Sequence, residues 1–130
     1  EFIQISTGEV YGDLDKLNIE SSNESNLLYP SSYYSATKAA SDMLVYSCGH
    51  TFNLPYIITR TCNNFGDRQH DEKFIPTIIR SIASDESIPV YGDGTQIREW
   101  IWVEDNAKRI LELMLNSEVG TFNIGSGNSL

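Results

Sequence analysis

The sequence predicts an α/β domain with a largely parallel sheet. Short apolar runs, typical of buried strands, alternate with segments whose apolar residues recur at helical spacing. This alternation is the pattern of β–α–β units, in which helices connect parallel strands. The 130 residues, of which 40% are apolar and 21% charged, are enough for one domain with its own core.

The first predicted elements are a strand, a long loop and a helix. Residues 1–6 (EFIQIS) form a buried strand because apolar residues dominate the run. Residues 12–32 are rich in Asp, Asn, Ser and Glu, which predicts a loop. Either Ser31 or Ser32 is expected to cap a helix over residues 33–51, whose alanines and larger apolar residues keep helical spacing.

A second strand and a second helix follow. Asn53-Leu54-Pro55 ends the first helix, and residues 56–61 (YIITRT) are rich in β-branched side chains, which predicts a strand. Residues 62–66 (CNNFG) are expected to be the loop after this strand. The next helix spans residues 73–83, and Pro76 restricts its start to Phe74 or Ile75.

The remaining elements are a hairpin, a helix and a last strand. Residues 88–91 and 97–103 are strand-like and flank Gly92-Asp93-Gly94, which indicates a turn. Acidic residues begin a third helix, which runs over residues 104–116. Residues 121–124 form a short strand, and Gly125-Ser126-Gly127 ends it.

Composition excludes several classes of partner. The net charge of -9 argues against a nucleic-acid partner, which needs clustered Lys and Arg. Cys48 and Cys62 are expected to be reduced thiols, and with His50 and His70 they show no metal-ligand spacing, so no metal site is predicted. No apolar run reaches the roughly 20 residues of a membrane helix, and no signal peptide is evident, so a cytoplasmic location is expected.

Tyr34 and Lys38 form the first candidate catalytic pair. They are four residues apart on a predicted helix, so both side chains lie on one face. A nearby ammonium group favours the phenolate form of a tyrosine, and such a pair can act as a general base near neutral pH. Alone, the Y-x-x-x-K spacing also fits an exposed surface pair. Tyr33 lacks this spacing to Lys38.

Two longer motifs give the pair a context. Residues 30–42 (PSSYYSATKAASD) resemble the catalytic helix of extended short-chain dehydrogenases, and residues 6–12 (STGEVYG) resemble their strand-end S-T-x-E-V-Y-G motif. The resemblance implies a partial Rossmann-like, doubly wound parallel sheet with part of a small substrate-binding subdomain, and NAD as cofactor. It also implies that Tyr34 takes the proton of the sugar C4 hydroxyl, that Lys38 holds the nicotinamide ribose, and that Thr7 bonds the reacting oxygen.

Further motifs resemble one branch, the nucleoside-diphosphate-glucose 4,6-dehydratases of the dTDP-glucose 4,6-dehydratase type, which are lyases. Residues 61–66 (TCNNFG) are similar to their N-N-Y-G loop, which implies that Asn63 contacts the substrate and Asn64 the nicotinamide. Residues 71–76 (DEKFIP) are similar to their P-E-K-L-I-P segment. This likeness implies that Lys73 and Phe74 bind the nucleotide sugar, with Lys73 at the diphosphate.

A third likeness concerns Pro89-Val90-Tyr91-Gly92 and the segment Gln96-Ile97-Arg98-Glu99-Trp100. In the dehydratases these two segments are the arms of a hairpin that binds the nucleotide. The resemblance implies that Pro89 contacts the substrate, that Tyr91 packs near the nucleoside base, and that Arg98 binds the diphosphate. A guanidinium group suits phosphate oxygens because it can donate two parallel hydrogen bonds. Taken alone, Arg98 also fits a solvated charge on an edge strand.

One departure from the dehydratase pattern concerns the acid. Gly8 stands where the dehydratases have an aspartate that protonates the departing C6 hydroxyl, whereas Glu9, which removes the C5 proton, is retained. General acid help typically amounts to about 100- to 10,000-fold in rate. We expect elimination to be slowed, or water or Glu9 to supply the proton.

A second departure concerns the cofactor half. No G-x-x-G-x-x-G fingerprint is present, and the sequence opens inside a predicted strand. We expect residues 1–66 to be the C-terminal part of the NAD-binding domain, with its N-terminal glycine-rich half absent, and residues 67–130 to be the substrate-binding region with a returning helix. These residues alone are expected to bind NAD weakly.

Three functions remain open from the sequence. The leading one is dehydration of dTDP- or UDP-glucose to the 4-keto-6-deoxy sugar through transient oxidation at C4. UDP-glucuronate decarboxylases and sugar-nucleotide epimerases of the same superfamily share the Thr or Ser, Tyr and Lys, and a small residue at position 8 favours the decarboxylases. A catalytically impaired paralogue is the third.

A homodimer through the Tyr34/Lys38 helix is also expected, because that helix has more apolar surface than one core face needs.

Overall fold

The computed structural model describes residues 1–14, 21–90, 92–95 and 97–128. Helices and strands alternate in it, as the sequence predicts. In chain order the elements are β1 (Phe2–Thr7), the 3-10 helix η1 (Gly8–Tyr11), α1 (Tyr33–Phe52), β2 (Tyr56–Thr61), β3 (Asn63–Phe65), α2 (Phe74–Ala83), β4 (Trp100–Trp102), α3 (Val103–Leu115) and β5 (Gly120–Ile124).

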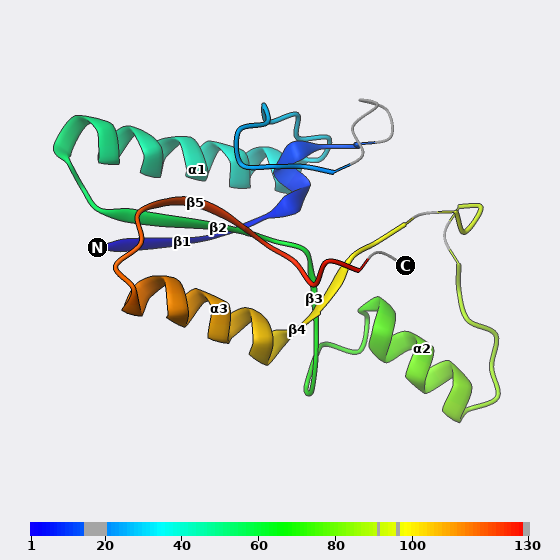
Figure 1. The fold of residues 1–130 in the computed structure, drawn as a ribbon. Helices are drawn as coiled ribbons and strands as arrows, with labels where there is room; N and C mark the ends of the chain where they lie inside the picture. Colours follow the sequence, from blue (N-terminus) through cyan, green and yellow to red (C-terminus); the bar gives the residue numbers. More distant parts are fainter. Residues whose placement is uncertain (15–20, 91, 96, 129–130) are drawn as a thin grey trace.

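The main sheet has three parallel strands in the order β1-β2-β5. Thr7, Thr61 and Ile124 are aligned across it, so the carboxyl ends of all three strands form one edge. Figure 1 shows α1 on one face of this sheet and α3 on the other, while β3, β4 and α2 lie beyond the edge. The predicted α/β fold with parallel strands is confirmed.

Helix α1 has the ends that the sequence predicts. Ser32 is the N-cap: its hydroxyl accepts a hydrogen bond from the Ser35 backbone N–H (3.1 Å), and the Ser35 hydroxyl accepts one from the Ser32 N–H (2.9 Å). This reciprocal capping box satisfies donors that a helix start leaves free. At the other end Asn53 adopts the left-handed conformation, with φ 52°, which ends the helix before Pro55.

The core lies where α1 and η1 cover the sheet. Val10 and Tyr11 of η1 pack with Ala39 of α1, and Ile57 and Ile58 of β2 are buried. Strand β2 has a neighbour on each side and a helix on each face, which explains why its run of apolar residues is nearly continuous.

Two sequence predictions are wrong. The predicted loop 62–66 contains strand β3, because the Asn63 N–H donates to the Glu99 carbonyl (3.1 Å) and the segment pairs in parallel with β4. The predicted hairpin over 88–91 and 97–103 does not form in its described residues. Residues 88–90 are irregular, and β4 covers only Trp100–Trp102 and pairs with β3.

The turn between those two segments is present. Oδ1 of Asp93 accepts hydrogen bonds from the Thr95 N–H (3.1 Å) and hydroxyl (2.7 Å), and these bonds lower the pKa of the Asp93 carboxyl. Gly92 and Gly94 on either side have positive φ. A local Asp-based turn therefore forms without strand pairing around it.

Both cysteines are free thiols and half-buried. Within the described ranges, no group of three or more potential metal ligands comes together. In the same part of the chain, no helix has the length and apolar character needed to cross a membrane.

Candidate active site

The predicted catalytic residues gather at the carboxyl edge of the main sheet. Thr7 is the last residue of β1 and the N-cap of η1, and its Oγ1 accepts a hydrogen bond from the Glu9 N–H (3.3 Å). This bond fixes the turn that carries Glu9, whose side chain is exposed. In open α/β sheets, ligands bind beyond this edge.

Helix α1 brings Tyr34 and Lys38 to the same edge. Nζ of Lys38 donates a hydrogen bond of 2.6 Å to the backbone carbonyl of Ile5, which is two residues before Thr7 on β1. Tyr34 lies one turn earlier on α1, and it is 53% exposed. The helix packs on both β1 and η1. The structure therefore places the four predicted catalytic residues on two segments, β1–η1 and α1, that adjoin at this edge.

Gly8 begins η1, between Thr7 and Glu9. Its φ is not in the left-handed region, so its backbone suits any residue. A Cβ at this position would lie 3.5 Å from the Thr61 carbonyl oxygen, which is an ordinary van der Waals contact. An aspartate would therefore fit at position 8, and neither backbone nor space explains the glycine.

Asn63 and Asn64 are engaged with the protein itself. The Asn63 amide donates to the Glu99 carbonyl (3.3 Å). The Asn64 amide donates to Thr61 Oγ1 (3.3 Å) and accepts from the Asn106 amide of α3 (2.8 Å). Both side chains therefore hold β3 against its neighbours, a role that the sequence did not reveal. Their contacts with substrate and nicotinamide stay predictions.

The predicted nucleotide-binding residues lie at the start of α2 and in the segments that precede β4. Lys73 is the exposed N-cap residue of α2. Phe74, half exposed, stacks on Trp100 of β4 with ring centroids 6.0 Å apart and an interplanar angle of 21°, so the start of α2 contacts β4. Arg98 is exposed, and its Nη1 donates to the Ile97 carbonyl (2.9 Å). Pro89 is exposed in an irregular segment. Tyr91 lies outside the described residues.

Cys62 and Glu99 lie close together at the end of the sheet. The Glu99 carboxylate accepts hydrogen bonds from the Gly127 N–H (2.7 Å) and the Ser126 hydroxyl (3.3 Å), which places it across the end of β5. Burial raises the pKa of the Cys62 thiol, and repulsion from the Glu99 charge raises it further. The thiol therefore stays protonated at neutral pH.

A buried polar network, which the sequence did not reveal, lies behind the site. Nε of Arg60 on β2 donates to Asp42 Oδ2 on α1 (3.0 Å), and these side chains are 5% and 0% exposed. Nη1 of Arg60 donates to the Tyr11 hydroxyl (2.9 Å), which donates to Asn123 Oδ1 on β5 (2.7 Å). The Arg60 guanidinium carbon also lies 5.0 Å from the centre of the Tyr11 ring. The sequence does contain a sign of this network: Arg60 is the one charged residue in the otherwise uncharged strand 56–61 (YIITRT), and a buried charge needs a partner.

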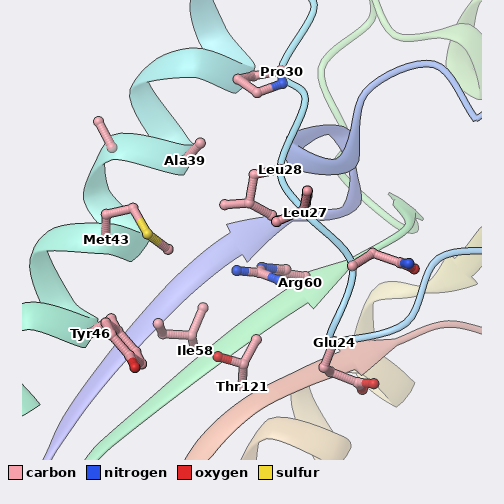
Figure 2. A pocket seen from close by; sticks show the side chains of 12 residues that line it. Glu24, Leu27, Leu28, Pro30, Ala39, Met43, Tyr46, Ile58, Arg60 and Thr121 are labelled. Carbon is pink, nitrogen blue, oxygen red and sulfur yellow. The ribbon is translucent and has the colours of Figure 1, made fainter. Parts of the chain in front are cut away.

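A cavity of about 530 Å³ lies beside Arg60. Figure 2 shows it between α1, residues 24–30 and strands β2 and β5, with Met43, Leu28 and Ile58 among its apolar walls. Its lining includes none of the predicted site residues that the structure describes. The cavity is thus separate from the candidate site at the sheet edge.

Comparisons with known proteins identify relatives of this chain. The model of the NAD dependent epimerase/dehydratase family matches residues 1–125. The low-salt glycan biosynthesis protein Agl12 of Haloferax volcanii is 50% identical over 130 residues, which cover 99% of this chain and 41% of that protein. The dTDP-glucose 4,6-dehydratase of Neisseria gonorrhoeae is 46% identical over 128 residues, which cover 98% and 37%.

A solved structure shares the fold as well. The dTDP-glucose 4,6-dehydratase of Bacillus anthracis, in complex with NAD, superposes with a TM-score of 0.93 at 38% identity, covering 98% of this chain and 41% of that one. This chain spans about two fifths of the length of the curated relatives it matches. The order of its motifs, its parallel sheet and the family match lead to one conclusion: the chain belongs to the NAD dependent epimerase/dehydratase family.

Proposed function

We propose that these residues form the catalytic part of an NAD-dependent nucleoside-diphosphate-glucose 4,6-dehydratase. The single observation that carries the proposal is the convergence of Thr7, Glu9, Tyr34 and Lys38 at one sheet edge, with Lys38 bonded to β1. Relatives named dTDP-glucose 4,6-dehydratase, which match nearly the whole chain, support it.

The donor groups at this edge suit the nicotinamide half of NAD. The Tyr34 phenol and the Lys38 ammonium group are hydrogen-bond donors of the kind that ribose hydroxyls accept. Tyr34 and Lys38 would hold the ribose, with Asn64 next to the nicotinamide. The chemistry that NAD supplies when bound is removal of a hydride from C4 of the sugar and its return to C6.

In the proposed mechanism, the Tyr34 phenolate takes the proton of the C4 hydroxyl while the Thr7 hydroxyl donates to the same oxygen. Oxidation makes the C5 proton acidic because it is then adjacent to a ketone, and the Glu9 carboxylate removes it. The electron pair of the C5–H bond forms the C5–C6 double bond, and the C6 hydroxyl takes a proton, either from Glu9, which has just received one, or from solvent water, and leaves as water. Lys73, Phe74, Pro89, Tyr91 and Arg98 would bind the nucleotide, with the two cations at the diphosphate.

Gly8 favours one alternative function, the decarboxylation of UDP-glucuronate. With Gly8 in place of an acid, the protein needs another proton source to expel the C6 hydroxyl, whereas decarboxylation of a UDP-glucuronate has no such requirement. The likeness of residues 61–66 (TCNNFG) and 71–76 (DEKFIP) to dehydratase segments supports the dehydratase. The two activities differ in the mass of their products.

The test uses the complete native gene product. It is incubated with dTDP-glucose, with UDP-glucose and, as a control, with UDP-glucuronate. The masses of the sugar nucleotides are then measured by mass spectrometry. Loss of one water from a glucose nucleotide is the expected result, and the preferred base identifies the substrate. Loss of carbon dioxide from the glucuronate would instead assign a decarboxylase. No mass change with NAD bound would indicate the impaired paralogue.

We also propose that the protein is a homodimer through α1. Leu44 is 69% exposed on this helix, and Met43 and Tyr46 are about half exposed, which is more apolar surface than one soluble helix normally leaves in water. Light scattering of the native gene product tests the dimer, and Leu44→Glu is expected to shift it to the monomer. The cytoplasmic location stays a prediction that cell fractionation would test.

A further inference from the structure

The buried network of Asp42, Arg60, Tyr11 and Asn123 connects the two segments that carry the catalytic groups. Asp42 is on α1, one helical turn after Lys38 and two turns after Tyr34. Tyr11 is the last residue of η1, two residues after Glu9. Arg60 bonds both of them from β2. The network is therefore a buried polar connection between the helix that carries Tyr34 and the turn that carries Glu9, beside the apolar contact of Val10 and Tyr11 with Ala39.

Two hydrogen bonds with fixed directions hold α1 in place. Lys38 donates to the carbonyl of Ile5 on β1, and Asp42 accepts from Arg60 on β2. Because these contacts lie one turn apart on the helix and on neighbouring strands, they oppose both sliding of α1 along its axis and rotation about it. Apolar packing alone is non-directional and would not fix either movement so closely.

The energetics argue against stability as the main role. A buried ion pair loses the hydration of both charges, and replacing it by apolar residues of similar volume often leaves stability unchanged or higher. Such a pair does impose a specific geometry, since its hydrogen bonds form in only one arrangement. The catalytic groups need that geometry, because a misplacement of about 1 Å can cost about 100-fold in rate.

We propose that Tyr11, Arg60 and Asp42 are positioning residues: their network sets the position of α1 relative to η1, and so the distance between Tyr34 and Glu9 in the reaction. None of the three touches the substrate in this proposal. It rests on the proposed function, since positioning is defined by the reaction that Tyr34 and Glu9 perform.

The test measures kcat and KM of the complete native gene product and two variants, with the nucleotide sugar that the parent dehydrates. Tyr11→Phe keeps the ring beneath Arg60 and removes only the hydroxyl that Arg60 and Asn123 share. Asp42→Asn keeps the side-chain shape and removes the charge. Both are expected to lower kcat by at least about tenfold, while KM stays within about twofold because the nucleotide-binding residues are elsewhere.

Two controls separate positioning from folding. Ile58→Val on β2 lowers the unfolding temperature by core packing alone, and Glu112→Gln removes the exposed ion pair with Arg109 on α3. With rates measured well below each unfolding midpoint, both controls should keep the parent kcat. If Tyr11→Phe has the kcat of the parent and an unfolding temperature lowered as in Ile58→Val, the network serves stability only. That result overturns the positioning role and leaves the proposed function standing. A parent that leaves the mass of every sugar nucleotide unchanged overturns the proposed function and this inference with it.

Discussion

The Lys38 ammonium group donates a 2.6 Å hydrogen bond to the backbone carbonyl of Ile5. This bond ties the second turn of α1 to β1 just before the strand reaches Thr7. Lysine has three donors, so one bond to the strand leaves two for a ribose hydroxyl and the solvent. A single side chain can therefore both fasten the helix and serve the proposed cofactor.

Replacing Lys38 tests these two roles together. Lys38→Met keeps the length of the side chain and removes its charge and donors. We expect kcat of the native gene product to fall by about 100-fold or more, because the bound cofactor loses a proposed donor to its ribose and can no longer be held in the reactive position. The free energy of unfolding should fall by only about 1 kcal/mol, the usual net value of one hydrogen bond. Urea unfolding and steady-state kinetics measure the two effects, and a variant with full activity contradicts the proposed role.

Tyr33 and Tyr34 form a natural matched pair. They are neighbours at the start of α1 and are 96% and 53% exposed, so neither contributes much to the core. Tyr34→Phe is expected to lower turnover by at least about 100-fold, since it removes the proposed base. Tyr33→Phe should leave turnover at the parent value. Equal effects of the two substitutions would show that the spacing to Lys38 does not select the base.

Gly8→Asp tests the missing acid. The position accepts a Cβ at 3.5 Å from the Thr61 carbonyl, and an acidic residue suits the start of a helical turn. We expect stability to change by less than about 0.5 kcal/mol, as for most surface substitutions. Turnover should rise, by up to about 100-fold, if proton donation to the C6 hydroxyl is slow.

Gly8→Ala is the control for that experiment, because it fills the same space without an acid. It should keep the parent turnover. If Gly8→Asp also keeps it, the protein already has a proton donor at C6, and expulsion of the hydroxyl does not limit the rate.

Gly12→Ala should destabilise the protein where Gly8→Ala does not. Gly12 has φ 82° and ψ -156°, a conformation that is almost restricted to glycine, and a Cβ there would collide with the Tyr29 carbonyl. We expect a loss of about 1 to 3 kcal/mol in the free energy of unfolding, the usual cost of such a strained residue. Chemical denaturation followed by circular dichroism measures it. A loss below that of Gly8→Ala would mean that the chain near Tyr29 can move aside.

The Cys62 thiol should react slowly with iodoacetamide at neutral pH. Burial and the Glu99 charge both raise its pKa, and only the thiolate reacts. Its rate should therefore keep rising with pH beyond about 8.5, where an ordinary cysteine is half ionised. Because the folded-state pKa is raised, the stability that this thiol contributes is constant below that pH and decreases above it.

Glu99→Gln removes one cause of the shift and keeps an acceptor for the Gly127 N–H. Cys62 in this variant should react faster than in the parent at the same pH, measured in a Cys48→Ser background. The exposed Glu112→Gln provides the reference and should leave the rate unchanged. An unchanged rate in Glu99→Gln would show that burial alone controls the thiol.

The sequence predicted the elements with strong local signals. The Ser32 cap, the Pro55 break and the β-branched run of β2 each depend on neighbouring residues, and each is confirmed. Strand β3 depends instead on a distant partner: Asn63 bonds the carbonyl of Glu99, and asparagine has low strand propensity. The predicted hairpin failed for the same reason, because β4 pairs with β3 rather than with the segment before the turn.

The candidate site, like the fold, has features that depend on local sequence and features that depend on distant partners. The proximity of Tyr34 and Lys38 follows from helical spacing, and the meeting of α1 with Thr7 follows from the parallel sheet. The internal bonds of Asn64 and the pairing of Arg60 with Asp42 join residues from different elements. Such contacts depend on how helices and strands pack, which spacing along the chain does not encode.

The order β1-β2-β5 has a consequence for the way the protein is made. Ile57 of β2 pairs with Gly120 of β5, which is 63 residues later in the chain. During synthesis β2 therefore cannot pair with β5 until these residues have left the ribosome. Contacts of this range slow folding, because a long loop must close before they form. During synthesis β2 would therefore expose an open, apolar edge, which is the kind of surface that chaperones bind and that nascent chains aggregate through.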